Sequence, residues 1–148
     1  MFFQCKKFNS DISKWNVSKG ETFKMMFYEC ESFNQDLSNW RTPLAIDMQE
    51  MFRGCKSYNM PMDLWETGRV KKFGALFMDC ESFNQDLNLW DMKNAKHCYN
   101  MFNGCLMFNG NVSNWKTPKC IDFSKMFMDC ESFNQDLSEW DVSHGIEF

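Results

Sequence analysis

Apolar side chains return to the same positions every 25 residues along the whole chain, without an insertion or a deletion. We call such a set of equivalent positions a column. The tryptophan column consists of Trp15, Trp40, Trp65, Trp90, Trp115 and Trp140. The cysteine column consists of Cys5, Cys30, Cys55, Cys80, Cys105 and Cys130, and the asparagine column of Asn9, Asn34, Asn59, Asn84, Asn109 and Asn134. A fixed period of about 20–50 residues is typical of stacked repeats, so equivalent residues are expected to lie one above another.

Two shorter spacings occur within each repeat and predict its secondary structure. From Trp140 to Val142 the apolar residues are two apart, which fits a short strand with alternate residues facing the core. From Ile121 to Cys130 they are mostly three and four apart, which fits a short α- or 3₁₀-helix with one buried stripe. The sequence therefore predicts a leucine-rich-repeat-like (α/β) repeat solenoid. It would have about six 25-residue coils, with short parallel strands on one face and short helices on the other.

The sequence of the repeat also resembles that of a known family. The unit M-F-x-x-C-x-x-F-N-x-D-L-S-x-W-x-V, near its consensus from Met126 to Val142, is similar to the BspA-like leucine-rich-repeat surface proteins. Within that group it resembles the 25-residue variety described as a Mycoplasma protein of unknown function. The resemblance covers the whole chain, with local departures such as Pro61 in place of an aspartate. It implies a cell-surface or secreted protein whose repeats bind partners, and it implies no catalytic activity.

The chain is expected to form one repeat-solenoid domain over residues 1–148. Solenoids need terminal coils with a polar outer side, and neither end of this sequence shows one, so we expect a fragment of a longer array. No signal peptide is recognisable within the segment. Localisation at the cell surface or in the secreted fraction therefore follows from the resemblance alone.

Charge and hydropathy narrow the classes of partner. The net charge is −4, whereas a nucleic-acid-binding surface is normally basic, so no nucleic acid is expected as a partner. No run of about 18 apolar residues occurs, so no membrane insertion is expected within this segment. A protein or a cell-surface ligand remains the expected partner.

The cysteine column allows three interpretations. Stacked cysteines would lie within the distance range of a disulfide, about 4.4–6.8 Å between Cα atoms, but each would have two equivalent neighbours. Zinc is disfavoured because no C-x-x-C motif occurs and a straight row of thiols does not form a tetrahedron. Because each cysteine lies between aromatic residues, we favour a reduced, buried ladder. Off this column, Cys98, Cys120 and the adjacent His97 leave a metal or redox pair open, although both cysteines also fit core positions.

Polar columns are also expected to be structural. The asparagine column is interpreted as a ladder of interior side chains that bond unpaired backbone groups at a turn. Aspartates Asp11, Asp36, Asp86 and Asp136 could bind calcium, but Pro61 and Asn111 interrupt their column, which favours turn capping. The tryptophan column could serve as a base-stacking platform, but the acidic charge and the inward phase of the strand favour core packing. We expect no catalytic, cofactor-binding or metal-binding residues and no cofactor.

Two columns on either side of the tryptophans vary from coil to coil and are expected to face outward from the strands. They consist of Lys14, Asn16, Asn39, Arg41, Leu64, Glu66, Leu89, Asp91, Asn114, Lys116, Glu139 and Asp141. Aligned in stacked strands, they would form an open partner-binding surface, with Leu64 and Leu89 as an apolar anchor. The same variation would also arise on a solvated face without a ligand. The sequence therefore predicts a non-enzymatic protein-interaction or adhesion module. The alternative is a structural spacer within a longer repeat array.

Overall fold

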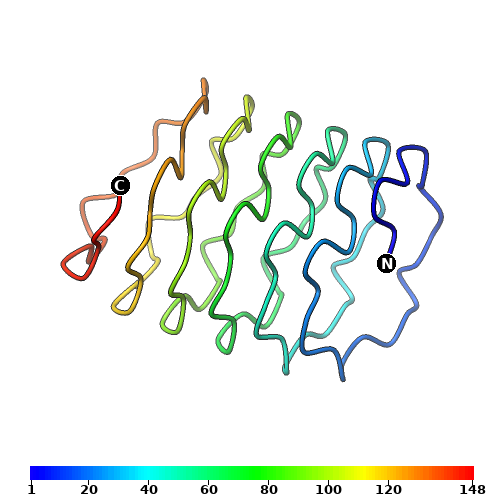
Figure 1. Ribbon diagram of the computed structural model, residues 1–148, viewed down its shortest axis with the longest axis horizontal. Helices are drawn as coiled ribbons and strands as arrows, with labels where there is room; N and C mark the ends of the chain where they lie inside the picture. Colours follow the sequence, from blue (N-terminus) through cyan, green and yellow to red (C-terminus); the bar gives the residue numbers. More distant parts are fainter.

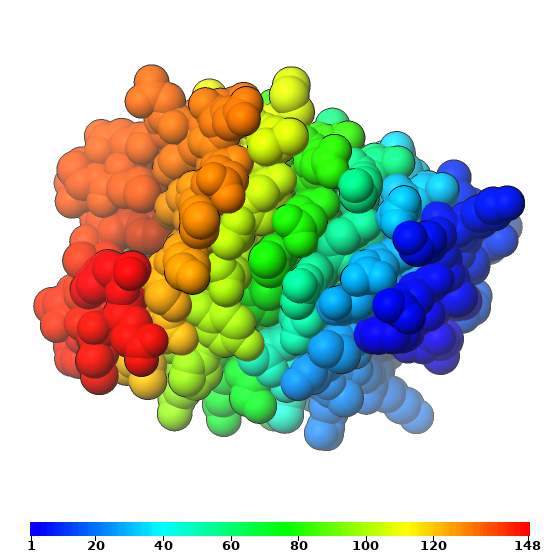
Figure 2. All heavy atoms as spheres, turned by 45° about the horizontal axis from the view of Figure 1, so that its top comes forward, coloured from blue at the N-terminus to red at the C-terminus, as the bar shows by residue number.

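The computed structural model describes residues 1–148 as a stack of coils that lie side by side (Figure 1). The coils span residues 1–25, 26–50, 51–75, 76–100, 101–125 and 126–148, and we number them one to six. Coil one and coil six form the two ends of the stack. Successive coils pack as parallel bands without gaps in the space-filling view (Figure 2).

The predicted α/β solenoid of strands and helices is wrong. The chain contains no α- or 3₁₀-helix and no extended strand, and its β-pairing consists of isolated parallel bridges. These bridges join Thr22 to Asp47, Asp47 to Lys72, Lys72 to His97, His97 to Asp122 and Asp122 to Glu147. Each coil consists of short turns joined by irregular segments.

The segment that was expected to be helical instead carries hydrogen bonds between coils. Residues 22–29 and their equivalents form what we call the bridge ladder. In it, the N–H groups of Phe23, Met25 and Phe27 donate to carbonyls 24 residues further on, at N···O distances of 2.9, 3.0 and 2.9 Å. The carbonyl of Asp47 accepts from coil one, while the N–H of the same peptide unit, on Met48, donates to Lys72 of coil three at 3.0 Å. Alternate peptide units of the ladder therefore point the same way along the stack.

Left-handed backbone conformations explain why the ladder is not a helix. Residues Gln4, Met25, Glu29, Glu50, Gly54, Ala75, Asp79, Asn100, Gly104, Lys125 and Asp129 have φ between 51° and 75°. An α-helix needs negative φ at every residue. The spacing of three arises from separate turns, because the Cys30 N–H donates to the Phe27 carbonyl at 3.0 Å and the turn then stops. The spacing is therefore helix-like although the backbone is not.

The segment that was expected to be a strand consists of turns held by side chains. The Trp40 N–H bonds the Leu37 carbonyl at 2.9 Å, and the Ala45 N–H bonds the Thr42 carbonyl at 3.1 Å. Between coils, the indole Nε1 of each tryptophan from Trp40 onward donates to a carbonyl 28 residues earlier, at 2.8–3.2 Å. The buried Thr42 hydroxyl donates forward to the Glu66 carbonyl at 3.4 Å. Side-chain donors therefore replace a strand ladder on this side of the coil.

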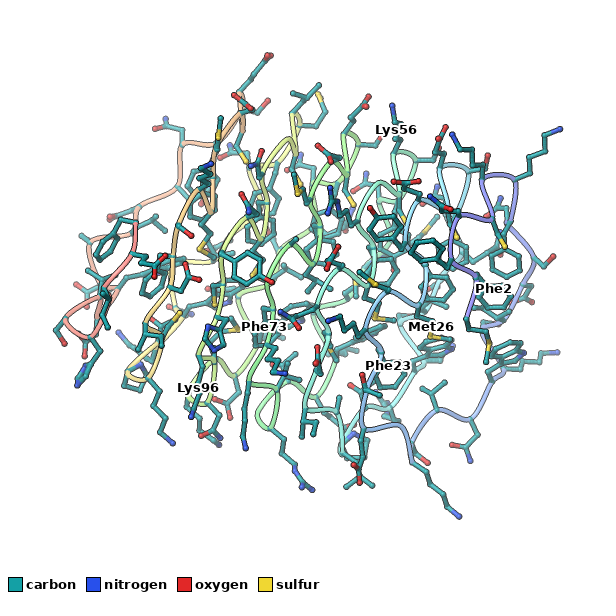
Figure 3. All side chains as sticks on the ribbon, in the orientation of Figure 1. Phe2, Phe23, Met26, Lys56, Phe73 and Lys96 are labelled. Atoms are coloured by element: carbon teal, nitrogen blue, oxygen red, sulfur yellow. The ribbon has the colours of Figure 1, made fainter.

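Aromatic columns fill the interior. Phe52 stacks on Phe27 with ring centroids 5.4 Å apart and on Phe77 at 5.8 Å. The tryptophans of coils two to five are at most 3% exposed, which confirms core packing for them rather than a base-stacking platform. By contrast, Lys56 and Lys96 extend outward from the stack (Figure 3). Equivalent residues therefore share burial, as the 25-residue period predicted.

Candidate partner-binding face

The two variable columns are exposed in every coil, and together we call them the outer face. All twelve residues predicted for it are exposed. Leu64 and Leu89 are 57% and 67% exposed, whereas Trp65 and Trp90, their neighbours in sequence, are each 3% exposed. The residues alternate between solvent and core as predicted, but they do so at turns and not along strands.

Part of the outer face stabilises its own turns. The side-chain oxygens of Asn16, Asp91 and Asp141 accept N–H groups two residues later, at 3.1, 3.2 and 3.0 Å. Hydrogen bonds from Ser143 hold the pKa of the Asp141 carboxyl below its usual range. Partial burial opposes the same shift at Asp91, but hydrogen bonds and charge from Lys93 still lower its pKa. These residues cap turns whether or not a partner binds.

Three other members join neighbouring coils. Glu66 accepts the Thr42 N–H at 3.0 Å, Lys116 donates to the Glu139 carbonyl at 3.3 Å, and the Asn114 N–H bonds the side chain of Asn88 at 2.8 Å. The side chains of seven members make no hydrogen bond or ion pair within the chain. These seven are Lys14, Asn39, Arg41, Leu64, Leu89, Asn114 and Glu139. Four of them lie in coils two to four, near the middle of the stack.

The cysteine column is a ladder of free thiols. From Cys30 onward each Sγ donates to the carbonyl of a phenylalanine 28 residues earlier, at 2.9–3.0 Å. That carbonyl also accepts a turn N–H, since Phe27 receives both the Cys30 N–H and the Cys55 thiol. Burial raises the pKa of Cys30 to about 11 and that of Cys80 well above its usual value. The reduced-ladder interpretation therefore matches the structure.

Thiol titration should reveal this ladder directly. In the native protein at pH 8, Cys5 should react quickly with Ellman's reagent, because it is the exposed cysteine. The half-buried Cys130, whose pKa burial raises to about 11, should react more slowly. After denaturation without reductant, all eight thiols should react. A smaller count would show disulfides and contradict the structure.

The same pKa shifts predict how stability depends on pH. Below the unfolded pKa of 9.0, the thiols carry their protons in both states and stability is unaffected. As the pH rises from about 9 to about 11, unfolded thiols ionise while folded Cys30 keeps its proton, so stability falls.

The polar columns serve the turns, as expected. Each asparagine side chain from Asn9 to Asn109 accepts the backbone N–H of the next asparagine in the column, at 2.7–2.9 Å. These asparagines are exposed or, at Asn34 and Asn59, half-buried, and none lies in the interior, which corrects one detail of the prediction. Asp11 and Asp136 accept the N–H of serines two residues later, both at 2.9 Å. This is the turn capping that the sequence favoured over calcium binding.

Cys98 and Cys120 do come together, in adjacent coils. The carbonyl of Asp122 accepts both the Cys98 N–H, at 2.9 Å, and the Cys120 thiol, at 3.6 Å. A hydrogen bond between the two thiols lowers the pKa of Cys120 and raises that of Cys98. His97 belongs to the bridge ladder. No three His, Cys, Asp or Glu side chains cluster in a way that could hold a metal ion.

A charged groove on another side of the stack was not predicted as a site. It has a volume of about 370 Å³ and contains no apolar residue. Its lining residues are Lys6, Glu29, Glu31, Gly54, Lys56, Asp79 and Glu81. Lys6 pairs with Glu31 at 2.8 Å and Lys56 with Glu81 at 3.0 Å, so its charges are largely satisfied within the chain. The sequence contains a signal for these pairs, because coils one and three carry lysines where coils two and four carry glutamates.

Stacked coils with a repeated core and a variable outer face define a tandem-repeat protein. The family model described as "Mycoplasma protein of unknown function, DUF285" matches residues 1–88 and 46–148, which together span the chain. The chain therefore belongs to this family. No curated protein and no solved structure matches it. The match supports the repeat family but not a specific identity as a BspA-like leucine-rich-repeat protein.

The structure contains no helix that is long and apolar enough to span a membrane.

Proposed function

We propose that this chain is a non-enzymatic binding module that recognises a protein partner through its outer face. The observation that carries the proposal is the exposure of two apolar side chains in adjacent coils, Leu64 at 57% and Leu89 at 67%. Exposed apolar groups that adjoin one another favour contact with another protein. Neither side chain belongs to the buried core, so both are available to a partner.

Charged residues around this pair add specificity. Arg41 lies one coil before Leu64 and makes no ion pair, while Glu66 and Asp91 place carboxylates beside the two leucines. A complementary partner would offer an apolar contact surrounded by charges of both signs. Charges at the rim of such a contact affect specificity and the association rate more than affinity.

Resemblance to BspA-like surface proteins supports a cell-surface or secreted location and an adhesion role.

The pattern of pKa shifts supports a non-enzymatic role. Shifted groups such as Cys80 and Asp136 are buried thiols or turn-capping carboxylates. In the charged groove, hydrogen bonds within exposed ion pairs raise the pKa values of Lys6 and Lys56 and lower that of Glu31, so these shifts have structural causes as well.

The test compares three forms of the chain against a panel of purified cell-surface and secreted proteins, with binding followed by biolayer interferometry. The face variant combines Arg41→Glu, Leu64→Ser and Leu89→Ser, which leaves the turn-capping residues intact. We expect the wild type to bind at least one panel protein. The face variant should bind that protein at least about tenfold more weakly, as loss of a central anchor does.

The matched control is the double variant Leu106→Ser, Met107→Ser. These side chains are 36% and 56% exposed and lie in a different part of the coil. The control should bind like the wild type, and all three forms should melt within a few degrees of one another. Equal binding by the face variant and the wild type would show that the outer face does not bind the partner.

A structural spacer is the second candidate. The observation that favours it is that several outer-face residues, including Asn16, Glu66 and Asp141, already serve the fold. A spacer would bind no panel protein, so neither the wild type nor the face variant would give a binding signal.

A further inference from the structure

Two cysteines outside the cysteine column contact each other across adjacent coils. Cys98 belongs to coil four and Cys120 to coil five, and both are buried. The carbonyl oxygen of Asp122 accepts the Cys98 N–H at 2.9 Å and the Cys120 thiol at 3.6 Å, so a single oxygen atom holds both residues. The two thiols also share a hydrogen bond. This arrangement brings two sulfur atoms into direct contact.

The cysteine column arranges its thiols differently. Cys55 and Cys80 direct their Sγ atoms at phenylalanine carbonyls, at 3.0 and 2.9 Å, and the other buried members do the same. Each of these thiols is therefore engaged with the backbone. Cys98 and Cys120 are the two that are engaged with each other.

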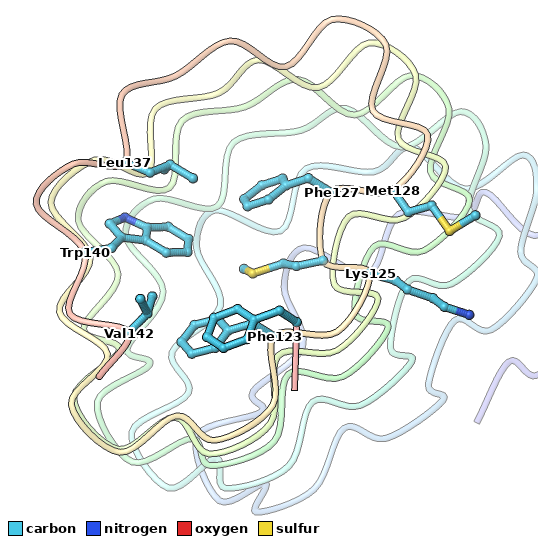
Figure 4. A pocket seen from close by; sticks show the side chains of 9 residues that line it. Phe123, Lys125, Phe127, Met128, Leu137, Trp140 and Val142 are labelled. Carbon is cyan, nitrogen blue, oxygen red and sulfur yellow. The ribbon is translucent and has the colours of Figure 1, made fainter. Parts of the chain in front are cut away.

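Cys98 occupies a position that every other coil gives to a larger side chain. The equivalent residues are Phe23, Met48, Phe73, Phe123 and Phe148. The rings of Phe23 and Phe73 pack against the tryptophan of the following coil, with centroids 6.3 and 5.9 Å apart. Phe123 likewise points into the interior toward Trp140, at 6.4 Å (Figure 4). Coil four lacks this aromatic contact, and it is the coil whose successor carries Cys120.

The pair lies just beneath the surface. Lys119 and Ile121 flank Cys120 in sequence, and both are exposed. The Ile121 N–H bonds the carbonyl of Lys96 at 3.1 Å, and Lys96, two residues before Cys98, extends outward from the stack (Figure 3). A small oxidant therefore needs only a local opening of these turns to reach the thiols.

We propose that Cys98 and Cys120 form a reversible disulfide when the chain meets a hydroperoxide. The Cys120 thiolate attacks the outer oxygen of the hydroperoxide, the O–O bond breaks, and the alcohol or water leaves with the proton that Cys120 released. Cys120 is then a sulfenic acid. The Cys98 sulfur attacks the Cys120 sulfur, the S–O bond breaks, and the hydroxyl group leaves as water with the Cys98 proton. The two thiols lose two electrons, and the hydroperoxide gains them.

The hydrogen bond between the thiols sets the order of these steps. It lowers the pKa of Cys120, although burial opposes the shift, and together with burial it raises the pKa of Cys98. Because the thiolate is the nucleophile, Cys120 reacts first and Cys98 completes the disulfide. The new bond would join coils four and five covalently. This inference does not depend on the outer face.

Thiol counting in a Cys5→Ser variant tests the proposal. This change removes the exposed cysteine, which would itself react with an oxidant. The variant is reduced, freed of reductant under nitrogen, and treated briefly with hydrogen peroxide. Ellman's reagent in denaturant should then find two thiols fewer than before treatment, and dithiothreitol should restore them. The oxidised form should melt several degrees higher, because the disulfide constrains the unfolded chain.

The matched control adds Cys120→Ala to the Cys5→Ser variant. Alanine is already present at the equivalent position in coils two and four, at Ala45 and Ala95, so the control should fold. Its thiol count should not change over the same treatment. A count that also stays constant in Cys5→Ser, or an equal loss in the control, would overturn the proposal.

Peptide mapping identifies which cysteines are joined. Digestion of the oxidised variant with trypsin and chymotrypsin separates Cys98 from Cys105, since chymotrypsin cleaves after Tyr99. Mass spectrometry should find one linked pair of peptides, which contains Cys98 and Cys120. A link between any other two cysteines, or oxidation of Cys120 without a link, would contradict the assigned pair.

Discussion

Replacing Trp90 with alanine is expected to lower the free energy of unfolding by about 3–5 kcal/mol, because the change removes a large buried side chain and leaves a cavity. The indole is 3% exposed and lies against Phe73, Phe77 and Trp115, with ring centroids 5.9, 6.2 and 6.4 Å away. Its Nε1 also donates to the Met62 carbonyl at 2.8 Å. The variant therefore loses packing with three rings and one bond between coils.

Trp15→Ala is the matched control, since it makes the same change in the same column. Trp15 is 42% exposed at the end of the stack, so its loss should cost about 1–2 kcal/mol. Urea denaturation followed by circular dichroism would measure both values. Equal losses for the two variants would contradict the burial gradient between the middle and the end of the stack.

Asp79→Pro is expected to lower the free energy of unfolding at least as much as Trp90→Ala, because it disrupts the backbone. Asp79 has φ of 59°, and its N–H donates to the Asn103 carbonyl at 2.8 Å. Proline fixes φ near −65° and has no N–H, so the bridge ladder would lose both the conformation and the bond. The cost should be about 3 kcal/mol or more. Because coil four lies in the middle of the stack, the break would separate coils on either side of it.

Lys93→Pro is the control for this change. Lys93 belongs to the same coil, and the equivalent positions in coils two and five are Pro43 and Pro118, so this column accepts proline. The variant loses the exposed ion pair with Asp91 and a turn bond of 3.2 Å, which should cost about 1 kcal/mol or less. Thermal melting of the two variants should separate them clearly. A Lys93→Pro variant that melts as low as Asp79→Pro would mean that proline is disfavoured throughout the coil.

The sequence predicted which residues stack and which are buried, because a 25-residue period without insertions requires equivalent neighbours. Trp65, Phe77 and Cys80 are buried as their columns predicted. It also predicted that Leu64 and Leu89 lie outside, since they flank an inward tryptophan. What the period could not predict was the contacts that members of the outer face make with their own turns.

The prediction of secondary structure failed because the spacing of apolar residues does not indicate the sign of φ. Residues three apart face the same side of a helix, but they also face the same side of successive turns. Of the left-handed residues, Gly54 and Gly104 give a clear sequence signal and Asp79 a weak one, while others, such as Met25 and Ala75, are residue types that rarely adopt positive φ. The sequence does not reveal the bonds between coils either, because a cysteine or tryptophan in an apolar column indicates packing and does not show where its thiol or indole N–H donates.

Hydrogen bonds between coils join residues about 25 positions apart, and this short reach has a consequence for how the molecule opens. Apart from the bond of 2.8 Å from Gln49 to the Tyr99 hydroxyl two coils away, each coil bonds to its two neighbours alone, so order can spread or retreat one coil at a time. Amide hydrogens near Phe52 and Phe77 should exchange most slowly with deuterium, and those near Phe2 and Phe127 most quickly. The molecule would then fray inward from both tips rather than melt from a single centre.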